Sequence, residues 1–188
     1  MGRDKALLLL DNQTLLARAL KKMRLLFDEV IIVTNQPCKY KFSGVREVTD
    51  IYPGRGPLGG IHAGLKAARF DKVFFVACDM PFWEPGLVRP LLEASADFDG
   101  VVPRNGCYLE PLFAIYTKTC LPVIENCLER NVFKVIEFLP LVRINYVEDE
   151  LLKTGSTLEK AFININTLED FYAYRRISLW EPDMMRSK

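Results

Sequence analysis

The chain has 188 residues, of which 49% are hydrophobic and 26% charged, a length and composition typical of one globular domain with a sizeable core. Its 25 Lys and Arg nearly balance 24 Asp and Glu, which excludes a basic field strong enough to bind nucleic acid without a specific site. No stretch approaches the about 18 consecutive apolar residues of a membrane-spanning helix. The five cysteines include no C-x-x-C pair and there is one histidine, which argues against a zinc site. We expect one domain over 1–188 in the reducing cytoplasm, without nucleic-acid or membrane partners.

The first hundred residues alternate between helical and strand patterns. Residues 12–27 carry apolar side chains three and four positions apart, with Asn12 or Thr14 placed to cap the helix. The glycine-rich stretch 54–64 leads into a helical segment that ends near Arg69, and another helix is expected over 85–96. Strands are expected over 30–33, 45–48 and 73–77. Continuously apolar strands that alternate with helices indicate βαβ crossovers. The prediction is an α/β fold with a mostly parallel sheet covered by helices.

The second half of the chain is less regular. Its apolar runs predict strands over 100–103, 112–116, 143–147 and 162–166. Helices are expected over 118–129, over 132–139 and from near Thr167. The tail over 180–188 shows no periodicity, so we expect it to be loosely packed.

Polar residues that directly follow the predicted strands are the first candidates for a site, because ligands of open α/β sheets lie beyond the carboxyl ends of the strands. Asn35, Asp50 and Asp79 hold such positions and are expected to share one crevice. Asp79 suits a hard divalent cation such as Mg²⁺. An alternative role for Asp79 is that of a turn-forming residue before Pro81.

Four other groups have both a ligand-binding and a structural interpretation. The glycine-rich run 54–60 opens a helix and allows backbone to approach a flat ring or an anion, or it is a flexible turn. Asp50 hydrogen-bonds a ribose hydroxyl or a base edge, or is a solvated turn residue. Lys5 neutralises a phosphate, or is a solvated lysine near the terminus. Asn164 and Asn166 present two amides on one face of a strand, or cap the following helix.

Four short motifs then stand out together: M-G-R-D-K-A-L-L at 1–8, G-P-L-G-G-I at 56–61, A-C-D-M-P-F at 77–82 and N-I-N-T-L-E-D at 164–170. In order and spacing they resemble the MobA family of molybdenum cofactor guanylyltransferases. The segment E-P-L-F-A-I-Y at 110–116 is similar to that family's P-L-x-A-x-Y. The resemblance covers nearly all of the chain from residue 1 to about residue 174.

The resemblance implies a three-layer α/β/α, Rossmann-like nucleotidyltransferase fold. It also implies Mg²⁺-dependent transfer of GMP from GTP to molybdopterin-bound molybdenum cofactor, with release of pyrophosphate. Lys5 and Asp79 would be the catalytic residues and Asp79 the metal ligand. By the same resemblance, Asn35 and Asp50 would contact the guanine nucleotide. The glycine-rich loop, with Gly56, Pro57, Leu58 and Gly59, would lie against the base. Asn164 and Asn166 would face the pterin. Docking to cofactor-biosynthesis proteins or molybdoenzymes would follow.

Two departures from the family pattern accompany this resemblance. Family members carry a strand and a loop of the form L-A-G-G-x-S-x-R ahead of M-G-x-D-K, the motif with which this sequence begins, so we expect the natural protein to extend upstream. That strand would lie inside the sheet, and its absence would leave unpaired backbone on both neighbours and a partly empty core. The second departure lies at 131–134, where the family often has an arginine.

Two other functions stay open at this point. A cytidylyltransferase for the same cofactor, or another NTP transferase, would share the fold and the magnesium aspartate. A non-catalytic module that holds molybdopterin or docks a partner enzyme would fit a chain without the phosphate-binding loop.

Overall fold

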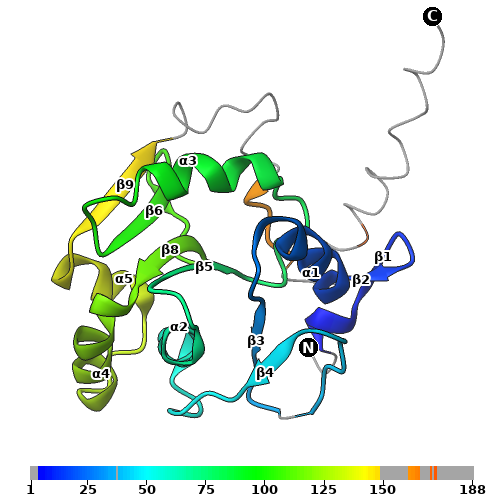
Figure 1. Cartoon of the computed structure of the whole chain (residues 1–188), viewed down its shortest axis with the longest axis horizontal. Coiled ribbons are helices and arrows are strands. Elements are labelled where there is room, and N and C mark those ends of the chain that lie inside the picture. The colour runs from blue at the N-terminus through cyan, green and yellow to red at the C-terminus, as the bar shows by residue number, and fades with distance from the viewer. Residues whose placement is uncertain (1–3, 37, 149–160, 166–169, 171, 173–188) are drawn as a thin grey trace, which may run out of the picture.

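The computed structural model describes residues 4–36, 38–148, 161–165, 170 and 172 (Figure 1). The helices are α1 (Leu15–Leu26), α2 (Gly56–Ala67), α3 (Val88–Glu93), α4 (Leu121–Glu129) and α5 (Val135–Phe138). The strands are β1 (Leu9–Leu10), β2 (Gln13–Thr14), β3 (Ile31–Val33), β4 (Arg46–Val48), β5 (Lys72–Val76), β6 (Gly100–Asn105), β7 (Tyr108–Leu109), β8 (Phe113–Thr117) and β9 (Ile144–Glu148). Among the described residues, no helix is long and apolar enough to cross a membrane.

The main sheet is mixed, with five strands. β8 pairs antiparallel with both β5 and β6, while β9 pairs parallel with β6, so β5, β6 and β9 run in one direction. A second, two-stranded sheet pairs β3 and β4 in parallel. The predicted α/β class is confirmed, and β8 is the long strand that runs against the others. The reason is its connection: β6 returns through a tight hairpin at Gly106 into β7 and β8, without the helix that a parallel crossover needs.

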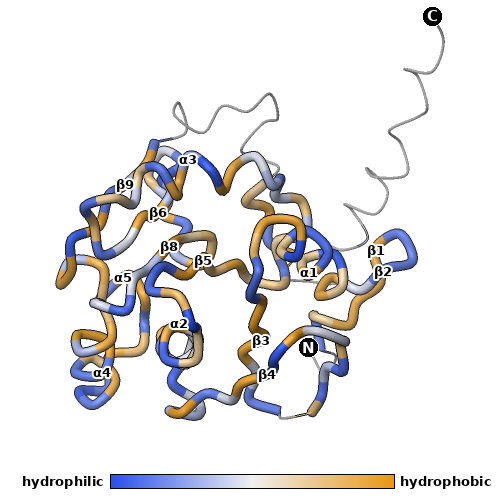
Figure 2. Tube along the Cα trace, in the orientation of Figure 1, coloured by the Kyte–Doolittle hydropathy of each residue, from blue (hydrophilic) through white to orange (hydrophobic). Residues whose placement is uncertain are grey.

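Side chains alternate between the two faces of the sheet, and both faces are buried. Phe113 and Ile115 of β8 pack with α3 and Trp83, whereas Ala114 and Tyr116 pack with α2, α4 and α5. In Figure 1, α3 accordingly lies on one side of the sheet and α2, α4 and α5 on the other. The hydrophobic colour in Figure 2 runs along β3 and β5. The three-layer α/β/α arrangement follows from this period-two burial.

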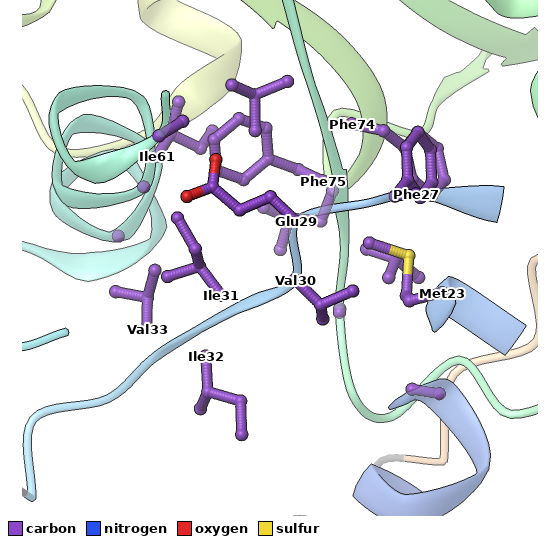
Figure 3. Close-up of a pocket in the computed structure, with 18 of the residues that line it drawn as sticks. Met23, Phe27, Glu29, Val30, Ile31, Ile32, Val33, Ile61, Phe74 and Phe75 are labelled. Carbon is purple, nitrogen blue, oxygen red and sulfur yellow. The ribbon is translucent and has the colours of Figure 1, made fainter. Parts of the chain in front are cut away.

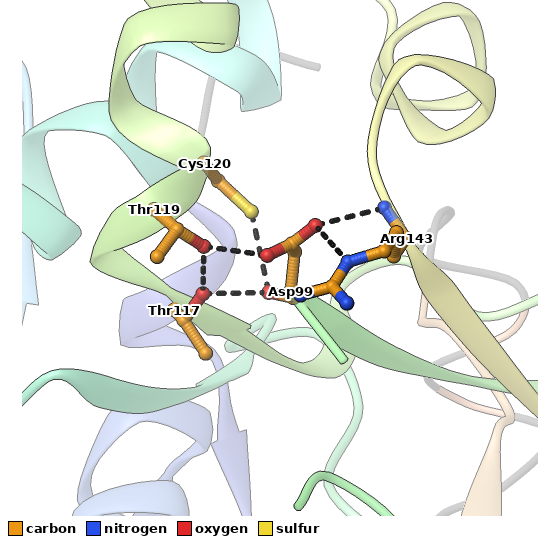
Figure 4. Close-up of polar contacts among 5 residues, drawn as sticks. All are labelled: Asp99, Thr117, Thr119, Cys120 and Arg143. Atoms are coloured by element: carbon orange, nitrogen blue, oxygen red, sulfur yellow. Dashed lines mark hydrogen bonds and ion pairs between the residues drawn. The ribbon is translucent and has the colours of Figure 1, made fainter. Parts of the chain in front are cut away.

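Asp99, just before β6, joins three strands through polar contacts (Figure 4). Its carboxylate accepts hydrogen bonds from Thr119 Oγ1 at 2.8 Å and from the backbone N–H of Arg143 at 3.0 Å. Its carbonyl oxygen accepts from Thr117 Oγ1 at 3.1 Å and from the Cys120 thiol at 3.2 Å. The hydrogen bond from the Arg143 backbone lowers the pKa of Asp99, because it stabilises the ionised carboxylate. This residue therefore fixes the start of β6 against the end of β8 and the approach to β9.

A cavity of about 890 Å³ separates the β3–β4 pair from the main sheet. β3 contributes Ile31 and Val33 to its lining, and β5 contributes Phe74 and Phe75. Met23 of α1 and Phe27, the residue after this helix, lie on one side and Ile61 of α2 on the other, so the walls are mainly apolar (Figure 3). Among the described residues, β3 pairs only with β4 and β5 only with β8, which leaves the second edge of each strand without a ladder.

Several predicted elements shift or change. α1 begins at Leu15 rather than at residue 12, because Asp11 and Asn12 adopt positive φ in the β1–β2 hairpin, which the sequence patterns did not predict. Thr14, and not Asn12, is the cap: its Oγ1 accepts from the Ala17 N–H at 3.1 Å. α3 ends at Glu93, three residues before the predicted end, and the helix predicted from residue 132 begins only at α5.

The strand predicted over 162–166 is wrong for its described part, since residues 161–165 contain no strand. Instead, the backbone N–H of Ile165 donates to the carbonyl oxygen of Asp79 at 2.9 Å, so this segment is bound to a turn and not to a neighbouring strand. Residue 166, the start of the last predicted helix and the 180–188 tail lie outside the described residues. That the whole chain forms one domain stays a prediction.

Candidate active site

Lys5 and Asp79 meet at the carboxyl end of β5. The Lys5 Nζ lies 3.5 Å from Asp79 Oδ2, although the two residues are 74 positions apart. Both side chains are partly open to solvent, at 33% and 22% relative exposure. The structure therefore brings together the two residues predicted to be catalytic. The Asp79 carboxylate faces this ammonium group, while its backbone lies in the turn after β5, so the metal-ligand and turn-forming roles of Asp79 both stay predictions.

Local structure explains how Lys5 reaches this position. Asp4 caps a short 3₁₀ turn over Lys5–Leu7, and its carboxylate accepts a hydrogen bond from the Ala6 N–H at 3.1 Å. The same carboxylate contacts Lys39 and Tyr40, which follow β3. Burial opposes ionisation of Asp4, but hydrogen bonds from Lys39 and Tyr40 outweigh it and lower the pKa of this carboxyl. Asp4 thus anchors the turn beside the carboxyl end of β3, while Lys5 extends toward the end of β5.

Asp50 lies against the first turn of α2. A Cβ atom added at Gly59 would come within 2.6 Å of Asp50 Oδ2, so only glycine allows this close approach. Asp50 Oδ1 also accepts a hydrogen bond from the Tyr52 N–H at 2.9 Å, which fixes the orientation of the carboxylate. The predicted pair of an acidic residue and a glycine-rich segment is therefore in contact.

The glycine-rich run itself is not a loop, and the loop interpretation of residues 56–60 is wrong. These residues form the first turn of α2, with Gly56 at φ 65°. Leu58 is fully buried among apolar residues of α4 and α5, whereas Gly56 and Pro57 are exposed. The physical reason is that Leu58 starts the apolar face of α2, so its side chain serves the core and only the surrounding backbone remains open to a ligand.

Arg55 is a residue of this region that sequence reasoning did not select. Its guanidinium stacks over the Phe133 ring at 4.6 Å and donates to Asn131 Oδ1 at 2.6 Å. These contacts fasten the 131–133 turn onto the start of α2, and Asn131 adopts a positive φ of 60° to allow them. The signal available in the sequence was a cation inside a glycine-rich run, which is also typical of a solvated turn.

The remaining predicted residues are placed less closely together. Pro57 and Asp79 line the same cavity, whereas Asn35 and Asp50 are not part of its lining, so the single crevice expected for Asn35, Asp50 and Asp79 stays a prediction. Asn35 is exposed in the turn after β3. Asn164 is exposed next to Ile165, whose backbone binds the Asp79 turn. Asn166 lies outside the described residues, and the common strand face expected for the two asparagines has no support in residues 161–165.

A divalent cation at this site would need ligands beyond the protein. Among the residues that the structure describes, no group of three or more His, Cys, Asp and Glu side chains is placed to hold a metal. Cys78, next to Asp79, is a poor ligand because burial raises the pKa of its thiol to about 11. One accessible carboxylate, that of Asp79, fits Mg²⁺, which is usually bound by one or two carboxylates together with waters and substrate phosphates.

Comparison with known proteins shows to which family the chain is similar. The profile of the MobA-like NTP transferase domain matches residues 1–143. A probable molybdenum cofactor guanylyltransferase from Pelotomaculum thermopropionicum is 44% identical over 175 residues, which cover 93% of this chain and 85% of the relative. A molybdenum cofactor guanylyltransferase from Syntrophotalea carbinolica is 35% identical over 94% of this chain and 85% of its own length.

A solved structure gives the same result at the level of the fold. The crystal structure of molybdopterin-guanine dinucleotide biosynthesis protein A from Archaeoglobus fulgidus superposes with a TM-score of 0.82 at 25% identity, over 95% of this chain and 92% of that one. The profile match spans most of the chain, and it includes Lys5, Asp50, Gly59 and Asp79. This chain belongs to the MobA-like NTP transferase family.

Proposed function

We propose that this protein is a molybdenum cofactor guanylyltransferase, which transfers GMP from GTP to molybdopterin-bound molybdenum cofactor and releases pyrophosphate. The observation that carries the proposal is the Lys5–Asp79 pair, 3.5 Å apart at the carboxyl end of β5. It joins a phosphate-neutralising cation to a metal-binding carboxylate in a chain of this family. The names of the relatives from Pelotomaculum thermopropionicum and Syntrophotalea carbinolica support the choice of reaction.

The reaction needs positioning and charge neutralisation more than a protein nucleophile. An oxygen of the terminal phosphate of molybdopterin attacks the α-phosphorus of GTP in line, and the bond between the α-phosphorus and the bridging oxygen of pyrophosphate breaks. Lys5 would hold nucleotide phosphates as a point charge. Asp79 would hold Mg²⁺, which when bound would neutralise charge on the phosphates. Both groups act on the phosphates, so no general base among the protein side chains is required.

The nucleotide base would lie near α2. In this proposal Asp50 accepts a hydrogen bond from the ribose or the base edge, and the backbone at Gly56 and Pro57 approaches the ring, because both residues are exposed at the helix start. Asn35 would contact the nucleotide from the turn after β3. Asn164 and Asn166 would face the pterin. Gly59 contributes by allowing Asp50 its close approach to α2.

The proposal extends to the surroundings of the protein. Cys38, Cys78, Cys107, Cys120 and Cys127 are all free thiols. Free thiols suit the reducing cytoplasm, which we propose as the location. Docking to cofactor-biosynthesis proteins or to the molybdoenzymes that receive the product is proposed as well.

The test combines nucleotide binding with turnover in two matched variants. Asp79→Asn removes the charge at the carboxyl end of β5, and Asp71→Asn removes a charge just before the same strand begins. We expect Asp79→Asn to lower guanylyl transfer by about 10² to 10³, the usual cost of losing one electrostatic group that acts on the transition state. Asp71→Asn should keep the activity of the unaltered protein, and both variants should keep its unfolding midpoint.

Three outcomes would contradict the proposal. Tighter binding of CTP than of GTP in a competition assay would favour the cytidylyltransferase alternative. Binding of molybdopterin without release of pyrophosphate would favour the non-catalytic module. Equal turnover of the Asp79→Asn and Asp71→Asn variants would remove Asp79 from the mechanism.

A further inference from the structure

Lys22 extends from α1 to the turn that carries Asp79. Its Nζ donates hydrogen bonds to the carbonyl oxygens of Pro81, at 2.8 Å, and of Trp83, at 2.5 Å. The same ammonium group lies 5.1 Å from the centre of the Trp83 ring. Both acceptors follow Asp79 within four residues. One side chain of α1 therefore holds the backbone on the downstream side of the turn.

The downstream end of this turn is itself rigid. The Trp83 side chain is fully buried and packs edge-to-face against Phe74 at 6.0 Å between ring centres. Around Asp79 itself, the N–H of Met80 donates to the carbonyl oxygen of Ala77 at 3.3 Å and closes the turn. Lys22 thus connects the backbone next to Asp79 with the aromatic core on one side and with α1 on the other.

Placing an ammonium group here has a cost that an apolar residue would avoid. Burial lowers the pKa of Lys22 to about 8, with a further contribution from the nearby positive charge of Arg18. A methionine on α1 would cover the Trp83 ring without this desolvation, but it would leave two carbonyl groups without their donor. The contacts of Lys22 are therefore directed at backbone geometry and not at burial of apolar surface.

We propose that Lys22 is a positioning residue of the guanylyltransferase, which holds the turn over residues 77–83 so that the Asp79 carboxylate stays directed at the divalent cation and the nucleotide phosphates. This inference rests on the proposed role of Asp79. Small displacements matter at such a site, because a shift of about 1 Å in a reacting or metal-binding group can cost on the order of 10²-fold in rate. The other contacts of Asp79, with Lys5 at 3.5 Å and with the Ile165 N–H at 2.9 Å, hold its side chain and its own carbonyl group, but neither holds the residues that follow.

The experiment measures Mn²⁺ binding in the presence of GTP, by electron paramagnetic resonance of free Mn²⁺, so the readout does not depend on turnover. Lys22→Met keeps the apolar stem and removes the ammonium group that donates both hydrogen bonds, while Lys22→Arg keeps a positively charged group that can donate to both carbonyls. Lys21→Met is the matched control, because Lys21 is the exposed neighbour on the same helix. Asp79→Asn tests the metal ligand itself. Thermal unfolding of each variant shows whether it is folded at the assay temperature.

We expect Lys22→Met to weaken Mn²⁺ binding about tenfold or more, Lys22→Arg to restore most of the affinity, and Lys21→Met to match the unaltered protein. A purely structural role for Lys22 would lower the unfolding midpoint and leave Mn²⁺ affinity unchanged, and this result would overturn the inference. If Lys22→Met is unfolded, the inference is decided by Lys22→Arg, whose Mn²⁺ affinity must stay close to that of the unaltered protein.

The result for Asp79→Asn separates the two levels of the proposal. Loss of Mn²⁺ binding in Asp79→Asn together with normal binding in Lys22→Met would refute only the positioning role of Lys22. Normal Mn²⁺ binding in Asp79→Asn would refute the metal-binding role of Asp79, and the positioning role with it.

Discussion

The contact between Gly59 and Asp50 offers a sharp test of the nucleotide site, because Gly60 on the same turn of α2 provides a control. A Cβ atom at Gly59 would lie 2.6 Å from Asp50 Oδ2 and 3.0 Å from Oδ1, whereas a Cβ atom at Gly60 would have nothing within 4 Å. Carbon and oxygen atoms in contact are normally about 3.3 Å or more apart. Gly59→Ala must therefore displace the carboxylate by roughly 0.5 to 1 Å, against the hydrogen bond that it accepts from Tyr52.

The two alanine variants should differ in stability. Each gains about 0.5 to 1 kcal/mol because alanine is a better helix former than glycine. Gly59→Ala also introduces overpacking, which usually costs about 1 to 3 kcal/mol. We expect Gly60→Ala to raise the free energy of unfolding by about 0.5 to 1 kcal/mol, and Gly59→Ala to lower it by up to about 2 kcal/mol. Urea unfolding measures both changes.

The two variants should also differ in GTP binding. A displaced Asp50 loses a hydrogen bond that involves a charged group, worth about 1.5 to 3 kcal/mol. Since 1.4 kcal/mol corresponds to a factor of about ten, Gly59→Ala should weaken GTP at least about tenfold in a calorimetric titration, while Gly60→Ala should not. Equal GTP affinity for the two variants would refute the assignment of Asp50 to the nucleotide site.

Three further predictions concern the scaffold. Hydrogen bonding lowers the pKa of Asp99 in the folded state, so the contribution of Asp99 to the free energy of unfolding is present above about pH 4 and is lost as pH falls through the folded pKa. Asp99→Asn should therefore lose less stability on acidification than the unaltered protein, as urea midpoints between pH 7 and 3 would show. Phe113→Ala removes a fully buried ring that packs on Phe74 at 5.0 Å and should lower the free energy of unfolding by about 3 to 5 kcal/mol in urea titrations. Amide hydrogen exchange should be faster in β3 and β5, which border the cavity, than in β6 and β8, and uniform protection of all four strands would contradict the open edges.

Local patterns were sufficient for most of the fold. The apolar run over 112–116 predicts a strand, and β8 forms there with side chains that alternate between two core clusters. Thr14 is the cap of α1 because its hydroxyl meets an N–H only three residues away. Asp79 follows β5 and lies where the end of a buried strand places a ligand-binding carboxylate. In each case the interacting groups are close in the sequence or repeat with the period of one element.

Other features depended on which segments come together. The antiparallel direction of β8, the burial of Leu58 and the absence of a strand in residues 161–165 each follow from contacts with distant parts of the chain. Lys22 lies at the edge of the apolar face of α1, and nothing near it in the sequence indicates an acceptor, because Pro81 is 59 positions away.

The sequence by itself therefore determined the α/β class, most of the elements, the family and the residue types of the site. Only the tertiary structure decided that Lys5 pairs with Asp79, that Asp50 lies against Gly59, and that a cavity separates β3 from β5. The physical reason is the range of the interactions. Helix caps and apolar periods are set by neighbouring residues, whereas an ion pair across 74 positions exists only once the intervening chain has packed.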